Sequence, residues 1–148
     1  MNKRFMQAAI EQAILAAQNG EVPIGAVVVK DGNIIAAEHN RCEERKDPAA
    51  HAELLAIQSA CRAVGDFRLT GAALYVTLEP CPMCAGAAVN ARLSEIVFGA
   101  ADPVKGALGS VCNLYSYHFP NRPEVFGGIE EKRCAALLQE FFRQRRRQ

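Results

Sequence analysis

The chain has 148 residues, half of them hydrophobic, which is the size of one domain with its own core. Its 17 basic and 16 acidic side chains leave a net charge of +1, so the overall charge points to neither nucleic acid, membrane nor acidic ligand. No stretch approaches the ~20 apolar residues of a membrane span, and the N-terminus lacks the apolar core of a secretory signal. We therefore expect residues 1–148 to be one cytoplasmic domain whose six cysteines stay reduced.

The predicted elements begin with a helix and a β-hairpin. Apolar residues recur at helical spacing at Met6, Ala9, Ile10, Ala13 and Ala17, and Asn19-Gly20 predicts the end of that helix. Two β-rich runs follow, over residues 24–30 and 33–38. Asp31-Gly32 between them is typical of a type I′ turn.

The second half of the chain predicts alternating helices and strands. A polar loop over residues 40–48 leads into a helix that ends near Val64. We expect a strand over 73–78, a helix over 82–91 and a strand over 95–99, an order typical of a parallel, right-handed βαβ unit. A last helix has an apolar face and a basic end, formed by Cys134, Leu137, Leu138, Phe141 and Phe142, then Arg143, Arg145, Arg146 and Arg147. Together these elements predict an α/β sandwich around one mixed sheet.

Two short segments carry residues suited to metal chemistry. Cys81-x-x-Cys84 follows a predicted strand and opens a helix, where a thioredoxin-like redox pair would also lie. With His51, the two thiolates make three zinc ligands, the number typical of a catalytic site that keeps one position open. The alternative is a closed structural zinc site, whose fourth ligand would come from Cys42, Cys61, Cys112 or His39.

Glu53 favours the catalytic interpretation. A carboxylate two residues from a metal ligand suits a proton shuttle and is not needed by a structural site. Residues two apart in a regular helix point about 200° away from each other. His51 and Glu53 therefore converge only if His51 lies at an irregular helix start, with Asp47-Pro48 in the preceding loop.

The combination matches the H-x-E … P-C-x-x-C signature of zinc-dependent base deaminases. Beyond that signature, the chain resembles the bacterial tRNA-specific adenosine deaminases nearly from end to end. The resemblance is carried by residues 21–27, 40–41, 47–53, 74–87, 97–100 and 134–138 with 141–142. Its specific parts are the Glu-Val-Pro-Ile-Gly segment and the aromatic, basic C-terminal helix.

The resemblance implies a cytidine-deaminase-like fold, a three-layer α/β/α sandwich with a five-stranded mixed sheet, assembled as a homodimer. It implies deamination of adenosine to inosine at the wobble position of tRNA, with the anticodon stem-loop as partner. The resemblance also implies that His51, Cys81 and Cys84 bind one zinc ion per chain and that Glu53 is the proton shuttle. The family's substrate contacts fall on Asn40, Asp102, Asn121, Phe142 and Arg146.

Two departures and two rival functions accompany this resemblance. Arg122 follows Asn121 where the family usually has histidine, in a loop one residue shorter, and Lys105 is displaced by one position from the common Asp-x-Lys spacing. The runner-up function is a zinc-dependent deaminase of a free base or nucleoside, such as guanine, cytosine or cytidine. A non-catalytic, zinc-stabilised RNA-binding module is the other rival, and Glu53 argues against it.

Overall fold

The computed structural model describes residues 1–147. Its centre is a five-stranded sheet in the order β2-β1-β3-β4-β5. The strands are β1 (Gly25–Lys30), β2 (Asn33–His39), β3 (Ala73–Leu78), β4 (Glu95–Ala100) and β5 (Glu124–Phe126). The helices are α1 (Lys3–Gln18), α2 (Cys42–Arg45), α3 (Ala52–Val64), α4 (Pro82–Asn90), the 3₁₀ turn η1 (Leu114–Ser116) and α5 (Glu131–Arg146).

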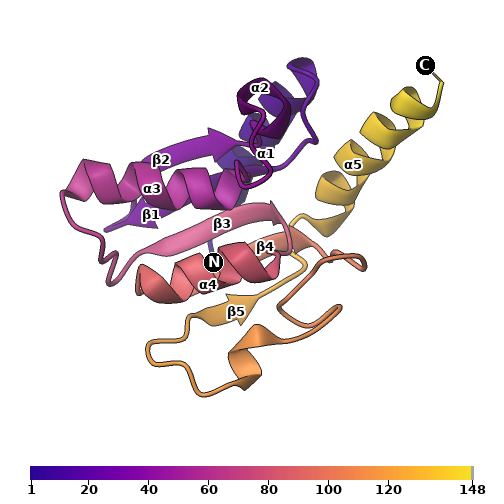
Figure 1. Cartoon of the computed structure of the whole chain (residues 1–148). Helices are drawn as coiled ribbons and strands as arrows, with labels where there is room; N and C mark the ends of the chain where they lie inside the picture. The colour runs from indigo at the N-terminus through magenta and orange to yellow at the C-terminus, as the bar shows by residue number, and fades with distance from the viewer. Residues whose placement is uncertain (148) are drawn as a thin grey trace.

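Helices cover both faces of the sheet (Figure 1). α3 and α4 pack on one face over a core that includes Leu74 and Ile96, and α1 and α5 pack on the other over Val27 and Val97. β1 pairs antiparallel with β2 and β3, whereas β3, β4 and β5 run parallel. The sheet is therefore mixed, and the predicted three-layer sandwich is confirmed.

The local sequence signals describe most elements correctly. Asp31 and Gly32 both have positive φ, at 52° and 77°, as a type I′ turn requires. The polar loop predicted over residues 40–48 contains the short helix α2, and the sequence did not indicate β5 or η1. β5 has three residues and pairs with β4 alone, so no periodic pattern of its own marks it. Within residues 1–147, no helix combines the length and apolar character that crossing a bilayer requires.

Several chain segments converge at one edge of the sheet. The parallel strands β3 and β4 end there, at Leu78 and Ala100, and β2 ends beside them because its His39 pairs with Gly25 of β1. The first turns of α3 and α4 lie at the same edge (Figure 1). In open α/β sheets this carboxyl edge is where ligands bind.

Candidate active site

Three metal-competent side chains meet where α3 and α4 begin. Nδ1 of His51 lies 3.6 Å from Sγ of Cys81 and 3.6 Å from Sγ of Cys84. Within residues 1–147 this is the one group of three or more histidine, cysteine or acidic side chains close enough to share a metal ion. Cys42, Cys61, Cys112 and His39 are not members of the group.

The donor set and its spacing fit zinc. A tetrahedral zinc ion with Zn–S of ~2.3 Å and Zn–N of ~2.0–2.1 Å separates an imidazole nitrogen from a thiolate sulfur by roughly 3.6 Å. Both nitrogen–sulfur distances have that value. Three protein donors without a fourth leave one coordination position for water or substrate, as in catalytic zinc sites.

The sulfur atoms of the group differ in acidity. Hydrogen bonds from Cys84 and His51 lower the pKa of Cys81 to about 3, although burial opposes them. The pKa of Cys84 is raised, because that thiol donates to Cys81 and is buried. The hydrogen bond with Cys81 raises the pKa of His51. Cys81 is thus the more acidic of the two thiols, and Cys84 lies beside it as a second soft donor.

Glu53 lies in the first turn of α3, two residues after His51. His51 has extended backbone angles (φ −76°, ψ 147°) at the helix N-cap, so its side chain turns toward the same space as that of Glu53. Asp47 and Pro48 lie in the preceding loop, as the sequence predicted. The Glu53 residue is 4% exposed, and this burial raises the pKa of its carboxyl group to about 7. Such a group both takes up and releases a proton near neutral pH.

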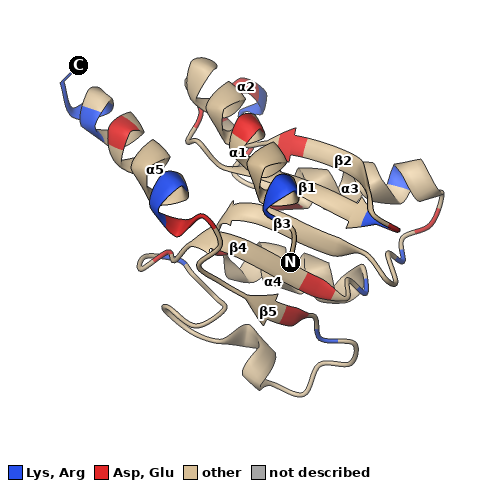
Figure 2. Cartoon of the chain, turned by 180° about the vertical axis from the view of Figure 1, so that it is seen from behind, with Lys and Arg blue, Asp and Glu red and all other residues tan. Residues whose placement is uncertain are grey.

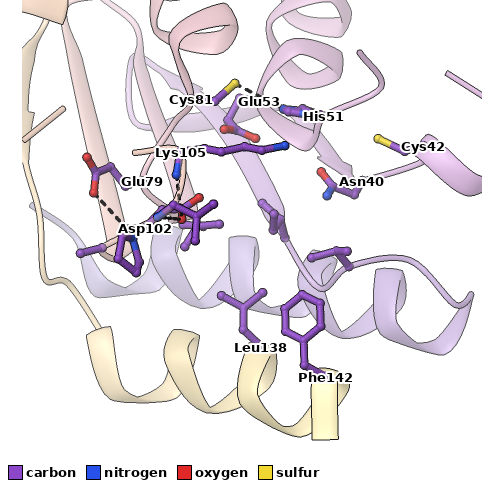
Figure 3. A pocket seen from close by; sticks show the side chains of 16 residues that line it. Asn40, Cys42, His51, Glu53, Glu79, Cys81, Asp102, Lys105, Leu138 and Phe142 are labelled. Atoms are coloured by element: carbon purple, nitrogen blue, oxygen red, sulfur yellow. Dashed lines mark hydrogen bonds between the residues drawn. The ribbon is translucent and has the colours of Figure 1, made fainter. Parts of the chain in front are cut away.

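These side chains line one wall of a cavity of about 510 Å³, a size typical of small-molecule sites (Figure 3). The opposite wall comes from α5, whose Leu138 and Phe142 point toward the metal donors. The remaining lining comes mainly from the ends of β2, β3 and β4 and the segments after them, and includes Val22, Ile24, Asn40, Cys42, Leu78, Glu79, Ala101, Asp102, Pro103, Val104 and Lys105.

Asn40 lines the cavity, and the two polar atoms of its side chain differ in their partners. Its Oδ1 accepts a hydrogen bond of 2.8 Å from the backbone N–H of Ala52, which caps the start of α3. Its amide nitrogen has no hydrogen-bond partner among the described residues. The fixed oxygen orients the amide, and its N–H groups remain donors for a ligand in the cavity.

Asp102 and Lys105 form the adjoining wall. Oδ1 of Asp102 accepts from the backbone N–H groups of Val104 and Lys105, at 2.9 and 3.2 Å, so the carboxylate shapes its own turn. The Lys105 side chain extends across the cavity near Glu53 (Figure 3). The sequence pattern showed the displacement of this lysine but did not place it in the cavity.

Two of the predicted substrate-binding residues, Asn121 and Arg146, lie outside the cavity lining. Asn121 is exposed in a loop with φ of 57°, and its neighbour Arg122 donates to the carbonyl oxygens of Tyr115 and Tyr117 at 2.7 and 2.8 Å. The arginine that departs from the family pattern therefore braces this loop from within. Arg146 is exposed in the last turn of α5.

Basic residues gather near the C-terminal end of α5 (Figure 2), and their contacts separate them into two pairs. Arg143 forms an ion pair with Glu140, and Arg145 donates to the carbonyl oxygen of Gly20 at 3.0 Å while its guanidinium lies 4.7 Å from the Phe141 ring centre. Arg146 and Arg147 form no side-chain hydrogen bond or ion pair within residues 1–147. Among the terminal arginines of the described residues, Arg146 and Arg147 are therefore the two whose side chains have no protein partner.

Comparison with known proteins relates this site to deaminases. Residues 1–146 match the family of MafB19-like deaminases. The chain is 50% identical over 144 residues to the tRNA-specific adenosine deaminase of Bacillus subtilis, covering 97% of this chain and 89% of the relative. A solved structure from a study of A-to-I editing by tRNA:A34 deaminases at the wobble position of transfer RNA superposes with a TM-score of 0.88 at 45% identity. That match covers 93% of this chain and all of the other. A guanine deaminase from Bacillus subtilis matches less completely, with a TM-score of 0.65 and 41% identity over 68% of this chain and 66% of that one.

Proposed function

The chain belongs to the MafB19-like deaminases and to the tRNA-specific adenosine deaminases, and we infer that it hydrolyses adenosine to inosine at the wobble position of a tRNA anticodon. One observation carries this function. A cavity that joins a His-Cys-Cys donor set to a buried glutamate lies in a chain similar to such enzymes along almost its whole length. The likeness is not limited to the zinc motifs, which all base deaminases of this type share.

We propose one zinc ion per chain, held by His51, Cys81 and Cys84. The support is the donor chemistry and the two distances of 3.6 Å. A zinc ion there would supply a Lewis acid that makes a water acidic enough to be deprotonated near neutral pH. Two thiolates and one imidazole suit zinc better than the hard cations Mg²⁺ or Ca²⁺, which prefer oxygen.

Glu53 is the group we assign to proton transfer. It accepts a proton from the attacking water as the water oxygen bonds to C6 of adenine, and it delivers that proton to ring N1. It then moves the remaining hydroxyl proton to the amino nitrogen, the C6–N bond breaks, and ammonia leaves inosine. Its burial excludes bulk water from this exchange, and its pKa near 7 suits both directions of transfer.

The substrate contacts we propose come from three parts of the chain. The amide of Asn40 donates to the base, Asp102 and the Phe142 ring contact the flipped nucleotide, and Asn121 and Arg146 meet the RNA outside the cavity. Flipping is easiest in a single-stranded loop, such as an anticodon loop. The exposed loop of Asn121 and the free guanidinium of Arg146 support contacts beyond the base.

We also propose that the chain acts as a homodimer in the cytoplasm. Four large apolar side chains in the segment between β4 and β5 are at least 39% exposed, namely Val104, Val111, Tyr117 and Phe119. An association surface over this segment would cover their apolar area. The cytoplasmic location rests on the expectation from the sequence that the six cysteines stay reduced. Light scattering of the purified protein measures its mass directly, and a monomer at micromolar concentration would contradict the dimer.

The decisive experiment compares substrates. Purified protein is incubated with an anticodon stem-loop carrying adenosine at the wobble position, and with guanine, cytosine and cytidine, while ammonia release is measured. We expect release from the stem-loop, with inosine as the nucleoside product. Release from guanine alone would instead support the free-base function, which the likeness to the guanine deaminase makes the specific alternative.

A further inference from the structure

A second buried glutamate, Glu79, stands beside the candidate active site. It follows β3 directly and precedes Pro80 and Cys81, and it is 2% exposed. Its Oε1 accepts from the backbone N–H of Asp102 at 3.0 Å and from the Ser110 hydroxyl. Its Oε2 accepts from the backbone N–H groups of Leu108 and Ser110 at 2.9 and 3.1 Å. All four donors belong to the segment of residues 101–110, which follows β4.

Other contacts join the same two segments. The N–H of Glu79 donates to the carbonyl oxygen of Ala100 at 2.9 Å, and the N–H of Ala107 donates to that of Pro80 at 2.9 Å. Gly106 packs on the Glu79 carboxyl group so closely that a Cβ there would lie 2.4 Å from Cδ. Only glycine leaves room for the carboxylate at this point. The segment 101–110 therefore surrounds the Glu79 carboxylate. Figure 3 shows one of these hydrogen bonds, the one from Asp102.

The surroundings of Glu79 are those of an anchor and not of an acid–base group. Both oxygens accept two hydrogen bonds each, so little capacity remains for a substrate proton. Charged acceptors make stronger hydrogen bonds to N–H groups than neutral ones do. Although Glu79 lines the cavity, its oxygens are occupied by donors of the protein itself.

We propose that Glu79 is a positioning residue for the deamination reaction. Its carboxylate ties residues 101–110, which bear Asp102 and Lys105, to the backbone that presents the metal donor Cys81. One wall of the cavity is thereby held in register with the metal donors and Glu53. The inference rests on the proposed function for its kinetic consequence, but the anchoring itself is independent of the substrate.

The test combines one variant, a milder second variant and a matched control. Glu79→Gln keeps the size of the side chain but replaces one acceptor by a donor, so at least one of the buried N–H groups loses its partner. Ser110→Ala removes a single donor and leaves the carboxylate. Ile10→Val trims a buried side chain of α1, far along the chain from the segment, and controls for general destabilisation.

Three quantities are measured on zinc-loaded full-length protein: bound zinc per chain, amide hydrogen exchange at Asp102, Leu108 and Ser110, and kcat and KM for the adenosine stem-loop. We expect Glu79→Gln to keep its zinc, to exchange those amides faster, and to lose kcat/KM on the order of 10²-fold, because a displaced wall misplaces the substrate. Ser110→Ala should shift the same quantities in the same direction by less.

The proposal would be overturned if Glu79→Gln showed the same amide exchange and the same kcat and KM as Ile10→Val. It would also be overturned if Glu79→Gln lost only kcat while the amides of Asp102, Leu108 and Ser110 stayed protected. If Glu79→Gln does not fold, the same comparison is made with Ser110→Ala. If the unmodified protein releases no ammonia from the stem-loop, the proposed function fails, and amide exchange alone then decides whether Glu79 anchors residues 101–110.

Discussion

Glu53 and Glu79 are buried glutamates at the same edge of the sheet, and their pKa values are shifted in opposite directions. Burial raises the pKa of Glu53 to about 7. Burial also acts on Glu79, but hydrogen bonds from the Ser110 hydroxyl and from backbone N–H groups outweigh it and lower the pKa of that carboxyl group. Two carboxyl groups whose environments separate their pKa values take different roles. Glu53 is suited to move protons and Glu79 to remain ionised.

The first prediction concerns Glu53→Gln. The amide retains the shape of the side chain but cannot accept a proton, so kcat should fall by roughly 10²–10⁴-fold. Zinc content, thermal stability and stem-loop binding should stay close to those of the unmodified protein. The matched control is Glu11→Gln, the same exchange at an exposed position of α1. Turnover near that of the control would remove Glu53 from the mechanism.

A second prediction follows from the lowered pKa of Glu79. Its pKa is lower in the folded chain than in the unfolded one, so folding favours the ionised form. The resulting stability is complete above the ordinary glutamate pKa of about 4.3 and is lost as the pH falls from there through the folded value. Urea unfolding across that acidic range should therefore show a weaker dependence of the free energy of unfolding on pH in Glu79→Gln. If the free energy of unfolding of Glu79→Gln depended on pH as strongly as that of the control Glu11→Gln, the prediction would be wrong.

At the scale of elements, α5 both lines the cavity and carries the basic C-terminal residues. Its inner part supplies Leu138 and Phe142 to the cavity wall, while Arg145 fastens its end to Gly20 beyond α1. In the sequence, the four terminal arginines appear as one basic end of the last helix. The structure instead separates Arg143 and Arg145, which have partners, from Arg146 and Arg147, which have none within the described residues.

The third prediction tests that division. Replacing Arg146 and Arg147 by glutamine should leave the thermal midpoint unchanged and weaken stem-loop binding. The slope of log affinity against log salt should flatten by about 0.7–0.9 for each phosphate that the protein no longer neutralises. Arg145→Gln should instead lower the thermal midpoint, since it removes the interactions with Gly20 and the Phe141 ring. An unaltered salt slope in the double variant would place the RNA-binding surface elsewhere.

Over the whole molecule, the sheet edge collects groups from distant parts of the chain. His51 precedes α3, while Cys81 and Cys84 belong to the start of α4, so a bound metal links the two helices that cover one face of the sheet. A ligand that binds only the folded state stabilises it in proportion to the logarithm of its concentration.

The fourth prediction is that a chelator lowers the thermal midpoint. Removing zinc present at 1,000 times its dissociation constant costs about 4 kcal/mol of folding free energy. Elemental analysis before treatment should find one zinc per chain, and adding zinc back should restore both the midpoint and the deamination. His51→Ala should bind zinc poorly and respond little to the chelator. A midpoint insensitive to chelation in the unmodified protein would argue against a metal that bridges α3 and α4.

The sequence by itself determined the elements that rest on local chemistry. The hairpin turn follows from Asp31-Gly32, because few other residues adopt positive φ at low cost. The helices follow from apolar residues repeated at helical spacing, and the irregular start of α3 from the requirement that His51 and Glu53 converge. The sequence also determined the chemistry of the site, because a histidine, two cysteines and a glutamate at these spacings have few other uses.

Only the tertiary structure decided the features that depend on segments far apart in the chain. β5 exists because β4 offers it an unpaired edge, and Glu79 is an anchor because residues 101–110 return to it with four donors. The separation of Arg145 from Arg146 likewise depends on where Gly20 lies. Local patterns indicate which residues of a segment are buried and which form its turns. They do not indicate which distant backbone N–H or carbonyl group contacts a given side chain. That pairing is set by the packing of the whole chain.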